Sequence, residues 1–260
     1  IQDEMKLMQE KFEDMEVKSF AREVIEFIDE CPSTYHVAKN CSEILEENGF
    51  SCPIICYSGA LILDENKNTV YSSGFNREIA GKVISFIEKE NFDCCWNLYS
   101  GDNWIVKDKS DERVITEENI VKTEAARGSV ESLSNDAKIG KILCICNPDK
   151  TDEIEDKIKK NFPDLSVVKS FHTMIEIMAP GITKGSAVLE LCRLWNIDVK
   201  RAAAFGDNYN DVEMLEVVGL PFLMENAPDE LKQRFKTITD SNNDEGIYKA
   251  LVKVGAIEQR

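Results

Sequence analysis

The chain has 260 residues, of which 43% are hydrophobic and 30% charged, and its formal net charge at pH 7 is −17. This composition is typical of a folded globular protein and excludes a disordered one. The negative charge argues against nucleic acid or an anionic membrane as partner, because a polyanion would be repelled over most of the surface. No stretch approaches the roughly 20 apolar residues of a membrane span.

Nine cysteines and two histidines, His36 and His172, are present, and no C-x-x-C pair occurs. A structural zinc site is therefore not expected. Several cysteines lie in apolar runs such as 142–146, where we expect them to act as small buried hydrophobes. The odd cysteine count and the lack of a secretory signal favour a reducing cytoplasm. The first residue is Ile rather than Met, which is compatible with a missing native start.

Residues 1–50 are predicted to form an acidic helical segment. Apolar side chains recur at spacings of three and four over 4–30, and a second helix is predicted over 35–47. The first helix carries a stripe made of Met5, Met8, Phe12 and Met15. We expect the stripe to pack on the protein's own core. A homo-oligomer formed through these helices is the weaker alternative.

In residues 51–178 the spacing of apolar side chains predicts mostly strands, with helices between some of them. The patterns predict strands at 54–57, 60–63 and 69–71, a helix at 77–91, strands at 94–99 and 103–107, a loop with one helix at 108–138, a strand at 141–146, a helix at 152–160, and strands at 166–169 and 174–178. The last four elements make a compact α/β unit.

The remainder alternates between helices and strands. Helices are predicted at 184–194, 211–217 and 229–235, and strands at 202–205 and 221–224. Alternation of this kind implies a parallel sheet with crossover helices, so the fold class is α/β.

The turn Gly206–Asp211 carries the clearest chemical pattern. A buried strand ends at Gly206, and ligands of open α/β sheets bind beyond the carboxyl ends of strands. Asp207 and Asp211 are four apart across the turn, so both carboxylates can face one point and, with waters and a phosphate, suit Mg²⁺. Asn210 can donate to a phosphate oxygen. Alternatively Asp211 is only a helix cap and Asp207 a turn residue, but the strand directly before the turn favours the metal site.

Lys184 stands where a helix is predicted to begin, 23 residues before Asp207. A lysine in the first turn is unfavourable for the helix dipole. It is either a solvated side chain or a fixed positive charge that holds a phosphate and offsets the acidic cluster. Its place one helix and one strand before Asp207 favours the second interpretation.

Four signatures in order, over about 52–249, resemble the Cof-type branch of the haloacid dehalogenase superfamily: Gly181–Ala187, Gly206–Asp211, Met224–Pro228 and Asn243–Gly246. The resemblance implies a Rossmann-like core, here 51–76 and 179–260, with an inserted α/β cap at 77–178. The helical segment 1–50 then stands in place of the usual first strands.

The resemblance also implies an activity and roles for site residues. Such proteins hydrolyse small phosphate esters with Mg²⁺ through an aspartyl-phosphate intermediate. Lys184 would be the phosphate lysine, Asp207 the main metal ligand, Asp211 a supporting carboxylate and Asn210 a polar member of the site. This implies a soluble hydrolase whose partner is a small phosphorylated substrate such as a sugar phosphate or a phosphorylated cofactor.

The chain departs from the family pattern at its nucleophile. The family has an aspartate in a D-x-D-G-T turn after the first strand, and no such motif is found here. Asp3, Asp14 and Asp29 all lie in helical or acidic context. The second family motif, a Ser or Thr followed by Gly-Arg, is absent too, although Thr34 occupies about that place and is a candidate phosphate ligand. An inactive protein that binds a phosphate ligand is therefore the alternative function.

Residues 21–50 resemble the amino-terminal segment of aspartyl aminopeptidases, through the run Ala21–Ala38. The zinc-binding motifs of those peptidases are not found downstream, so their activity is not carried over, and His36 is expected on a helix face or an interface. The segment is a replacement, a fusion or a gene-model error. Without a first strand, the strand at 202–205 leaves backbone groups unpaired at roughly 1–3 kcal/mol each. Another segment fills the gap, or 54–57 closes against 202–205, or the chain is incomplete.

Overall fold

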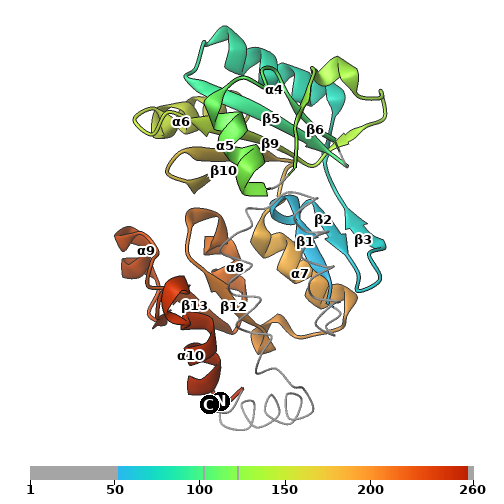
Figure 1. The fold of residues 1–260 in the computed structure, drawn as a ribbon. Coiled ribbons are helices and arrows are strands. Elements are labelled where there is room, and N and C mark those ends of the chain that lie inside the picture. Colours follow the sequence, from blue (N-terminus) through green and yellow to red (C-terminus); the bar gives the residue numbers. More distant parts are fainter. Residues whose placement is uncertain (1–51, 102, 122, 257–260) are drawn as a thin grey trace. The chain divides into compact units, whose positions relative to one another are not determined.

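The computed structural model describes residues 52–101, 103–121 and 123–256. Contacts divide the described chain into two compact units, the first unit at 52–187 and the second unit at 188–256. Figure 1 colours the chain from blue at residue 52 to red at the carboxyl end. The helices predicted over 4–30 and 35–47, their apolar stripe and Thr34 lie outside the described residues.

The first unit begins with a small antiparallel sheet of order β1-β2-β3, made of β1 (Ile54–Cys56), β2 (Leu61–Leu63) and β3 (Thr69–Ser72). A 3-10 turn, η1 (Tyr57–Gly59), joins the first two strands. The predicted hairpin between 60 and 71 is confirmed, because β2 and β3 pair antiparallel. Asp64 holds its turn, since Oδ1 accepts the N–H groups of Asn66 at 2.9 Å and Asn68 at 2.7 Å.

A six-stranded sheet of order β10-β11-β9-β5-β6-β7 forms the body of the first unit. Its strands are β5 (Cys94–Ser100), β6 (Asn103–Val106), β7 (Ala126–Arg127), β9 (Lys141–Cys146), β10 (Ser166–Phe171) and β11 (Met174–Met178). Strands were predicted at all of these positions except β7. Every residue of β9 is buried, as its near-continuous apolar run indicates for a central strand.

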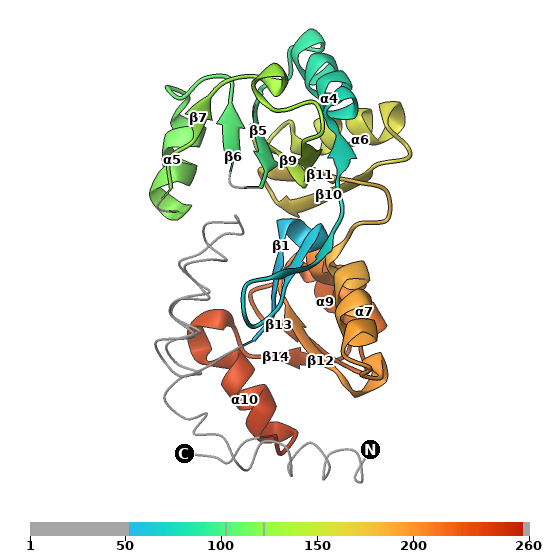
Figure 2. The ribbon, with the colours of Figure 1, turned by 90° about the vertical axis from the view of Figure 1, so that its right-hand side faces the viewer.

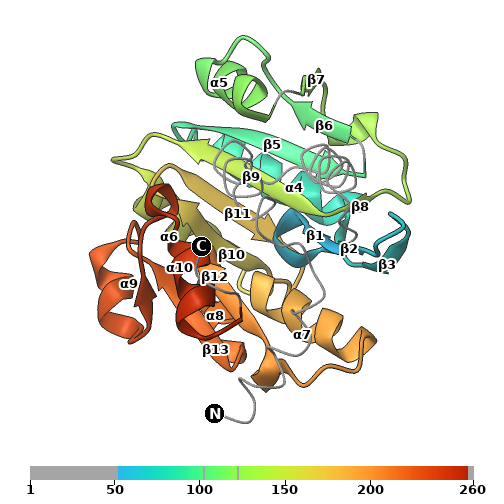
Figure 3. The ribbon, with the colours of Figure 1, turned by 60° about the horizontal axis from the view of Figure 1, so that its bottom comes forward.

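Three helices accompany this sheet: α4 (Arg77–Lys89), α5 (Glu112–Val121) and α6 (Thr151–Asn161). Helices α4 and α6 lie against the same face of the sheet (Figure 3). The predicted loop at 108–138 contains α5 and also β7, η2 (Val130–Ser132) and β8 (Lys138–Ile139). Strand β8 pairs with β4 (Phe75–Asn76) through only two residues, which is too short a pattern to identify in the sequence.

The second unit is built on a parallel sheet of order β12-β13-β14, with strands β12 (Ala203–Gly206), β13 (Leu220–Met224) and β14 (Ile238–Thr239). The predicted parallel sheet is thus confirmed. The rings of Phe205 and Phe222 stack at 5.0 Å across β12 and β13. Within the described part of this unit, β12 is an edge strand.

Helix α7 (Lys184–Leu194) has the bounds of the predicted helix, and it begins in the first unit and continues into the second. The others are α8 (Val212–Val217), α9 (Asp229–Arg234) and α10 (Gly246–Lys253), with 3-10 turns η3 (Val199–Arg201), η4 (Tyr209–Asp211) and η5 (Asn242–Asp244). Helix α8 packs on β12 and β13, and α10 lies beside β14 (Figure 2). Among the described helices, none has the length and apolar character needed to cross a bilayer.

Along the chain, the boundary between the two compact units falls between Ala187 and Val188. The boundaries predicted from the sequence instead place a cap at 77–178. All strands of the six-stranded sheet fall inside 77–178. The division into core and cap stays a prediction.

Candidate active site at the end of strand β12

The turn after β12 is organised by the carboxylate of Asp211. Its Oδ2 accepts the backbone N–H groups of Asp207 and Asn208, both at 3.0 Å, and the residue is 4% exposed. The Asn208 side chain in turn accepts the N–H of Tyr209 at 3.0 Å. Side-chain caps of this kind satisfy the first N–H groups of a helical turn. Asn208 is therefore the N-cap of η4 and Asp211 the third residue of its capping box, while Asp211 makes no side-chain cap at the start of α8. The choice between a metal ligand and a purely structural Asp211 stays open.

Gly206 makes this arrangement possible. A Cβ at this position would lie 2.5 Å from Cβ of Asp211 and 2.9 Å from its Cγ, closer than real Cβ contacts. Glycine therefore lets the Asp211 carboxylate fold back over the end of β12. A larger residue would push the carboxylate away from the two N–H groups that it accepts.

Asp207 is held from a second side by Asn226. The Nδ2 group of Asn226 donates to Oδ2 of Asp207 at 2.8 Å, and its Oδ1 accepts the N–H of Asn242 at 3.1 Å. These three residues follow β12, β13 and β14, whose carboxyl ends meet at one edge because the strands are parallel. Asn226 was missed as a site residue. The signature Met224–Pro228 marked its segment without giving it a role.

The structure thus brings Asp207, Asn210 and Asp211 together in one turn, with Asn210 half-buried in η4. Across residues 52–256, apart from 102 and 122, no group of three or more His, Cys, Asp or Glu side chains is placed to hold a metal ion. Asp207 and Asp211 are oxygen donors of the type that Mg²⁺ prefers, and their role as metal ligands stays a prediction.

Lys184 is the first residue of α7, in the first unit. Thr183 and Ser186 cap this helix reciprocally: Thr183 N–H donates to Ser186 Oγ at 2.9 Å, and Ser186 N–H donates to Thr183 Oγ1 at 3.1 Å. The sequence Thr-x-x-Ser satisfies two N–H groups at the start of the helix in the manner of a capping box. The cap fixes the backbone from which the Lys184 side chain extends.

The turn η1 packs against this helix start. Gly59, at φ +117°, lies so close to Thr183 that a Cβ would be 2.3 Å from its carbonyl oxygen. Tyr57 and Ser58 also have positive φ angles, 51° and 53°, which non-glycine residues adopt only at a cost.

A buried ion pair lies next to the same turn. Lys141 Nζ donates to Glu176 Oε1 at 3.0 Å, and Ser58 Oγ donates to Glu176 Oε2 at 2.5 Å. The two charged side chains are 2% and 4% exposed. Burial works to raise the pKa of Glu176, but Lys141, the Ser58 hydroxyl and the charge of Lys184 together outweigh it and hold that pKa below its ordinary value. Glu176 therefore stays a carboxylate at neutral pH.

The covalent nucleophile that the family resemblance implies has no counterpart in these elements. The sequence contains no two aspartates separated by one residue. Asp3, Asp14, Asp29 and Thr34 lie outside the described residues. Of the predicted site residues, the described chain contains the turn Gly206–Asp211 in the second unit and Lys184, at the start of α7, in the first unit.

Comparison with known proteins identifies the family. The model of the haloacid dehalogenase-like hydrolases matches residues 36–251. The chain belongs to this family. It is a hydrolase of the phosphatase type, as the four signatures predicted. A putative phosphatase of Haemophilus influenzae is 32% identical over 194 residues, covering 75% of this chain and 72% of that protein.

Two further matches agree with this membership. The 5-amino-6-(5-phospho-D-ribitylamino)uracil phosphatase YcsE of Bacillus subtilis is 26% identical, over 84% of this chain and 79% of its own. The sugar phosphatase BT4131, of subclass IIB of the superfamily, superposes with a TM-score of 0.73 at 21% identity, covering 84% of this chain and 81% of its own. The match with BT4131, at 21% identity, shows the fold alone. The predicted α/β fold of the superfamily is confirmed.

Proposed function

We propose that this member is a Mg²⁺-dependent phosphatase that hydrolyses a small phosphorylated metabolite, such as a sugar phosphate or a phosphorylated cofactor. Family membership supports hydrolysis of a phosphate ester. The named activities of YcsE and BT4131, on a phosphorylated ribityl compound and on sugar phosphates, support the size and class of the substrate. The net charge of −17 makes a nucleic acid or an anionic membrane a poor partner. We place the protein in the cytoplasm.

The observation that carries the proposal is the pair of backbone hydrogen bonds that the Asp211 carboxylate accepts. Because Asp211 accepts the N–H groups of Asp207 and Asn208, it holds the Asp207 backbone at the end of β12, and Asn226 donates to the Asp207 carboxylate. Asp207 and Asp211 would hold the Mg²⁺ ion, while Asn210 and Lys184 would bind phosphate oxygens. Bound Mg²⁺ neutralises charge on phosphoryl oxygens as it develops. The family resemblance gives Lys184 the role of a fixed positive charge that would bind a phosphate group.

The second candidate function is binding of a phosphate ligand without hydrolysis. It is favoured by one observation, the lack of any Asp-x-Asp pair in the sequence. Both functions use Asp207 as the main metal ligand, and they differ only in turnover.

One experiment tests both functions. Phosphate release from an aryl phosphate is measured with and without Mg²⁺, and Mg²⁺ binding to the same full chain is measured by calorimetry. We expect Mg²⁺-dependent release that falls by about 100-fold or more in Asp207→Ala, the scale of losing a charge-stabilising group. Asp229→Ala removes an exposed carboxylate of the same unit and serves as the control. Mg²⁺ binding without release would reject hydrolysis and leave the binding function.

A further inference from the structure

Three thiols gather on one face of the six-stranded sheet, and none of them is among the residues proposed for phosphate chemistry. Cys144 and Cys146 are two apart in β9 and so share a face of the strand. Cys94 of β5 stands directly opposite Cys146. Within β9 the thiol of Cys146 donates to the carbonyl oxygen of Cys144 at 3.7 Å. None of the three forms a disulfide in this structure.

The backbone register suits a bond between Cys94 and Cys146. The neighbouring pair is hydrogen-bonded, because Asn147 N–H donates to the carbonyl of Asp93 at 3.0 Å. Pairs alternate along an antiparallel ladder, so Cys94 and Cys146 form a non-hydrogen-bonded pair, whose Cα atoms lie about 4.5 Å apart. A disulfide needs a Cα separation of about 4.4–6.8 Å. The two sulfurs can therefore join without a shift of strand register.

Charge and hydrogen bonding favour the thiolate of Cys94. The thiol donors Cys144 and Cys146 lower its pKa most, burial opposes them, and the nearby Arg113 guanidinium lowers it further. The thiolate is the nucleophilic form of cysteine. The interaction with Cys94, and then burial, raise the pKa of Cys146. Once Cys94 has reacted, its thiolate no longer opposes loss of the Cys146 proton, and Cys146 becomes easier to deprotonate.

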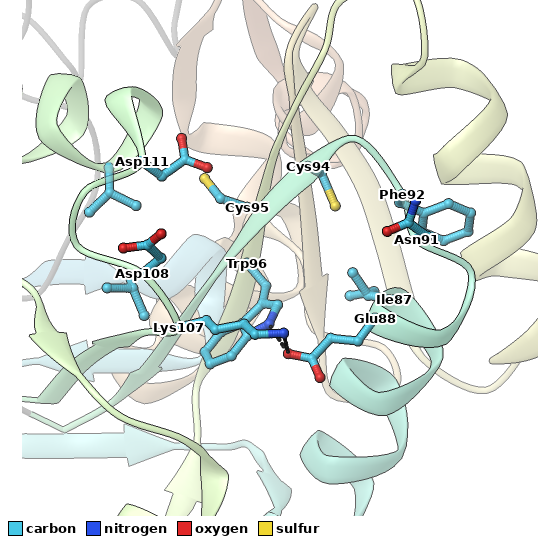
Figure 4. A pocket seen from close by; sticks show the side chains of 12 residues that line it. Ile87, Glu88, Asn91, Phe92, Cys94, Cys95, Trp96, Lys107, Asp108 and Asp111 are labelled. Carbon is cyan, nitrogen blue, oxygen red and sulfur yellow. Dashed lines mark hydrogen bonds and ion pairs between the residues drawn. The ribbon is translucent and has the colours of Figure 1, made fainter.

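A small cavity gives reagents access to Cys94. It has a volume of about 180 Å³ and is lined by α4, β5 and β6, with Ile87, Glu88 and Trp96 among its residues (Figure 4). A water molecule takes about 30 Å³ of liquid volume, so the cavity admits a small oxidant. Cys94 is half-buried at this cavity, whereas Cys144 and Cys146 are 0% and 2% exposed.

Cys95 lines the same cavity but has the opposite character. Figure 4 shows the Cys94 and Cys95 side chains pointing to different sides of β5, with the Cys95 sulfur beside the Asp111 carboxylate. Burial, and then the negative charge of Asp111, raise the pKa of Cys95 to about 12. Cys95 therefore stays a thiol at neutral pH and offers a matched control one residue away.

We propose that Cys94 is a site of oxidation by small hydroperoxides and that Cys146 resolves it to a Cys94–Cys146 disulfide. The Cys94 thiolate attacks the peroxide oxygen, the O–O bond breaks, and the second oxygen leaves as hydroxide or alkoxide. The sulfur is oxidised by two electrons to a sulfenic acid. Cys146 sulfur then attacks the sulfenic sulfur, the S–O bond breaks, and water leaves with the Cys146 proton.

The test treats the full chain with hydrogen peroxide at neutral pH, blocks free thiols, and maps peptides by mass spectrometry without reduction. In the unmodified protein we expect Cys94 to react about tenfold or more faster than Cys95, as its thiolate character implies. The product should be a crosslinked Cys94–Cys146 peptide. Because the rates are read in the unmodified protein, this comparison does not depend on the folding of any variant.

Variants then assign the two roles. Cys146→Ser should stop the crosslink and leave a sulfenic acid at Cys94 that a cyclic diketone probe captures, while Cys95→Ser should leave the crosslink unchanged. Equal rates at Cys94 and Cys95, oxidation confined to the exposed Cys52, or a crosslink from Cys94 to Cys144 would each overturn the proposal. Phosphate release plays no part in these readouts, so they stand apart from the proposed hydrolysis.

Discussion

Two carboxylate clusters in this protein are built in different ways. In the first unit, Glu176 is buried with Lys141 and the Ser58 hydroxyl, so a cation cancels its charge where it lies. In the second unit, Asp211 accepts backbone N–H groups and Asp207 accepts the amide of Asn226. These neutral donors orient the carboxylates without cancelling their charge. The first arrangement suits a structural role, and the second suits a carboxylate that receives a cation.

The buried pair should show the largest effect when it is broken. Lys141→Met leaves the Glu176 charge buried, and we expect the free energy of unfolding to fall by about 3–5 kcal/mol. Urea denaturation followed by the fluorescence of Trp96 and Trp104, both buried in the same unit, measures it.

A double variant is the control for this prediction. Lys141→Met with Glu176→Leu removes both charges, and most of the lost stability should return, because a buried pair adds little over apolar residues of similar size. A single variant as stable as the unmodified protein would show that Glu176 is neutral or hydrated, and the contrast between the two clusters would fail.

Two variants of Asp211, in the turn Gly206–Asp211, should separate the effect of this residue on stability from its effect on metal binding. Asp211→Ala leaves the N–H groups of Asp207 and Asn208 without their acceptor, and we expect a loss of about 1–3 kcal/mol in thermal unfolding. Asp211→Asn keeps an acceptor oxygen but removes the charge. It should keep most of the stability and weaken Mg²⁺ binding in calorimetry. Equal Mg²⁺ affinity in Asp211→Asn and the unmodified protein would remove Asp211 from the metal site.

An exposed ion pair on α4 serves as the counterpart of the buried pair Lys141–Glu176. Lys82 and Glu78 approach to 2.6 Å on α4, closer than Lys141 and Glu176, but their side chains are 64% and 73% exposed. We expect Lys82→Met to cost only about 0.3–0.5 kcal/mol in the same urea experiment, because water screens the pair. A loss as large as that of Lys141→Met would mean that burial does not decide the effect.

The sequence predicted well wherever local patterns decide. The helix over 184–194 and the strand over 174–178 were predicted to the residue, because the spacing of apolar side chains is a local signal. The turn at Gly206–Asp211 was identified for the same reason. Asn226 was missed, since its contact with Asp207 joins two loops that only the parallel sheet brings together.

The buried charges could not be predicted. Lys141 begins a strand and reads as a solvent-facing residue, and its partner lies 35 positions later, on a neighbouring strand. The pairing of Cys94 with Cys146 depends on strand register, which neither strand specifies by itself.

The side chain of Asn226 links two parts of the second unit through a single amide group. One end donates to the Asp207 carboxylate and the other accepts the N–H of Asn242, a half-buried residue of the loop that contains η5. A rotation of the carboxylate toward a bound ligand would therefore change the geometry at Asn242 without any ligand touching that loop. The backbone resonance of Asn242 in a nuclear magnetic resonance spectrum becomes a remote indicator of occupancy at Asp207.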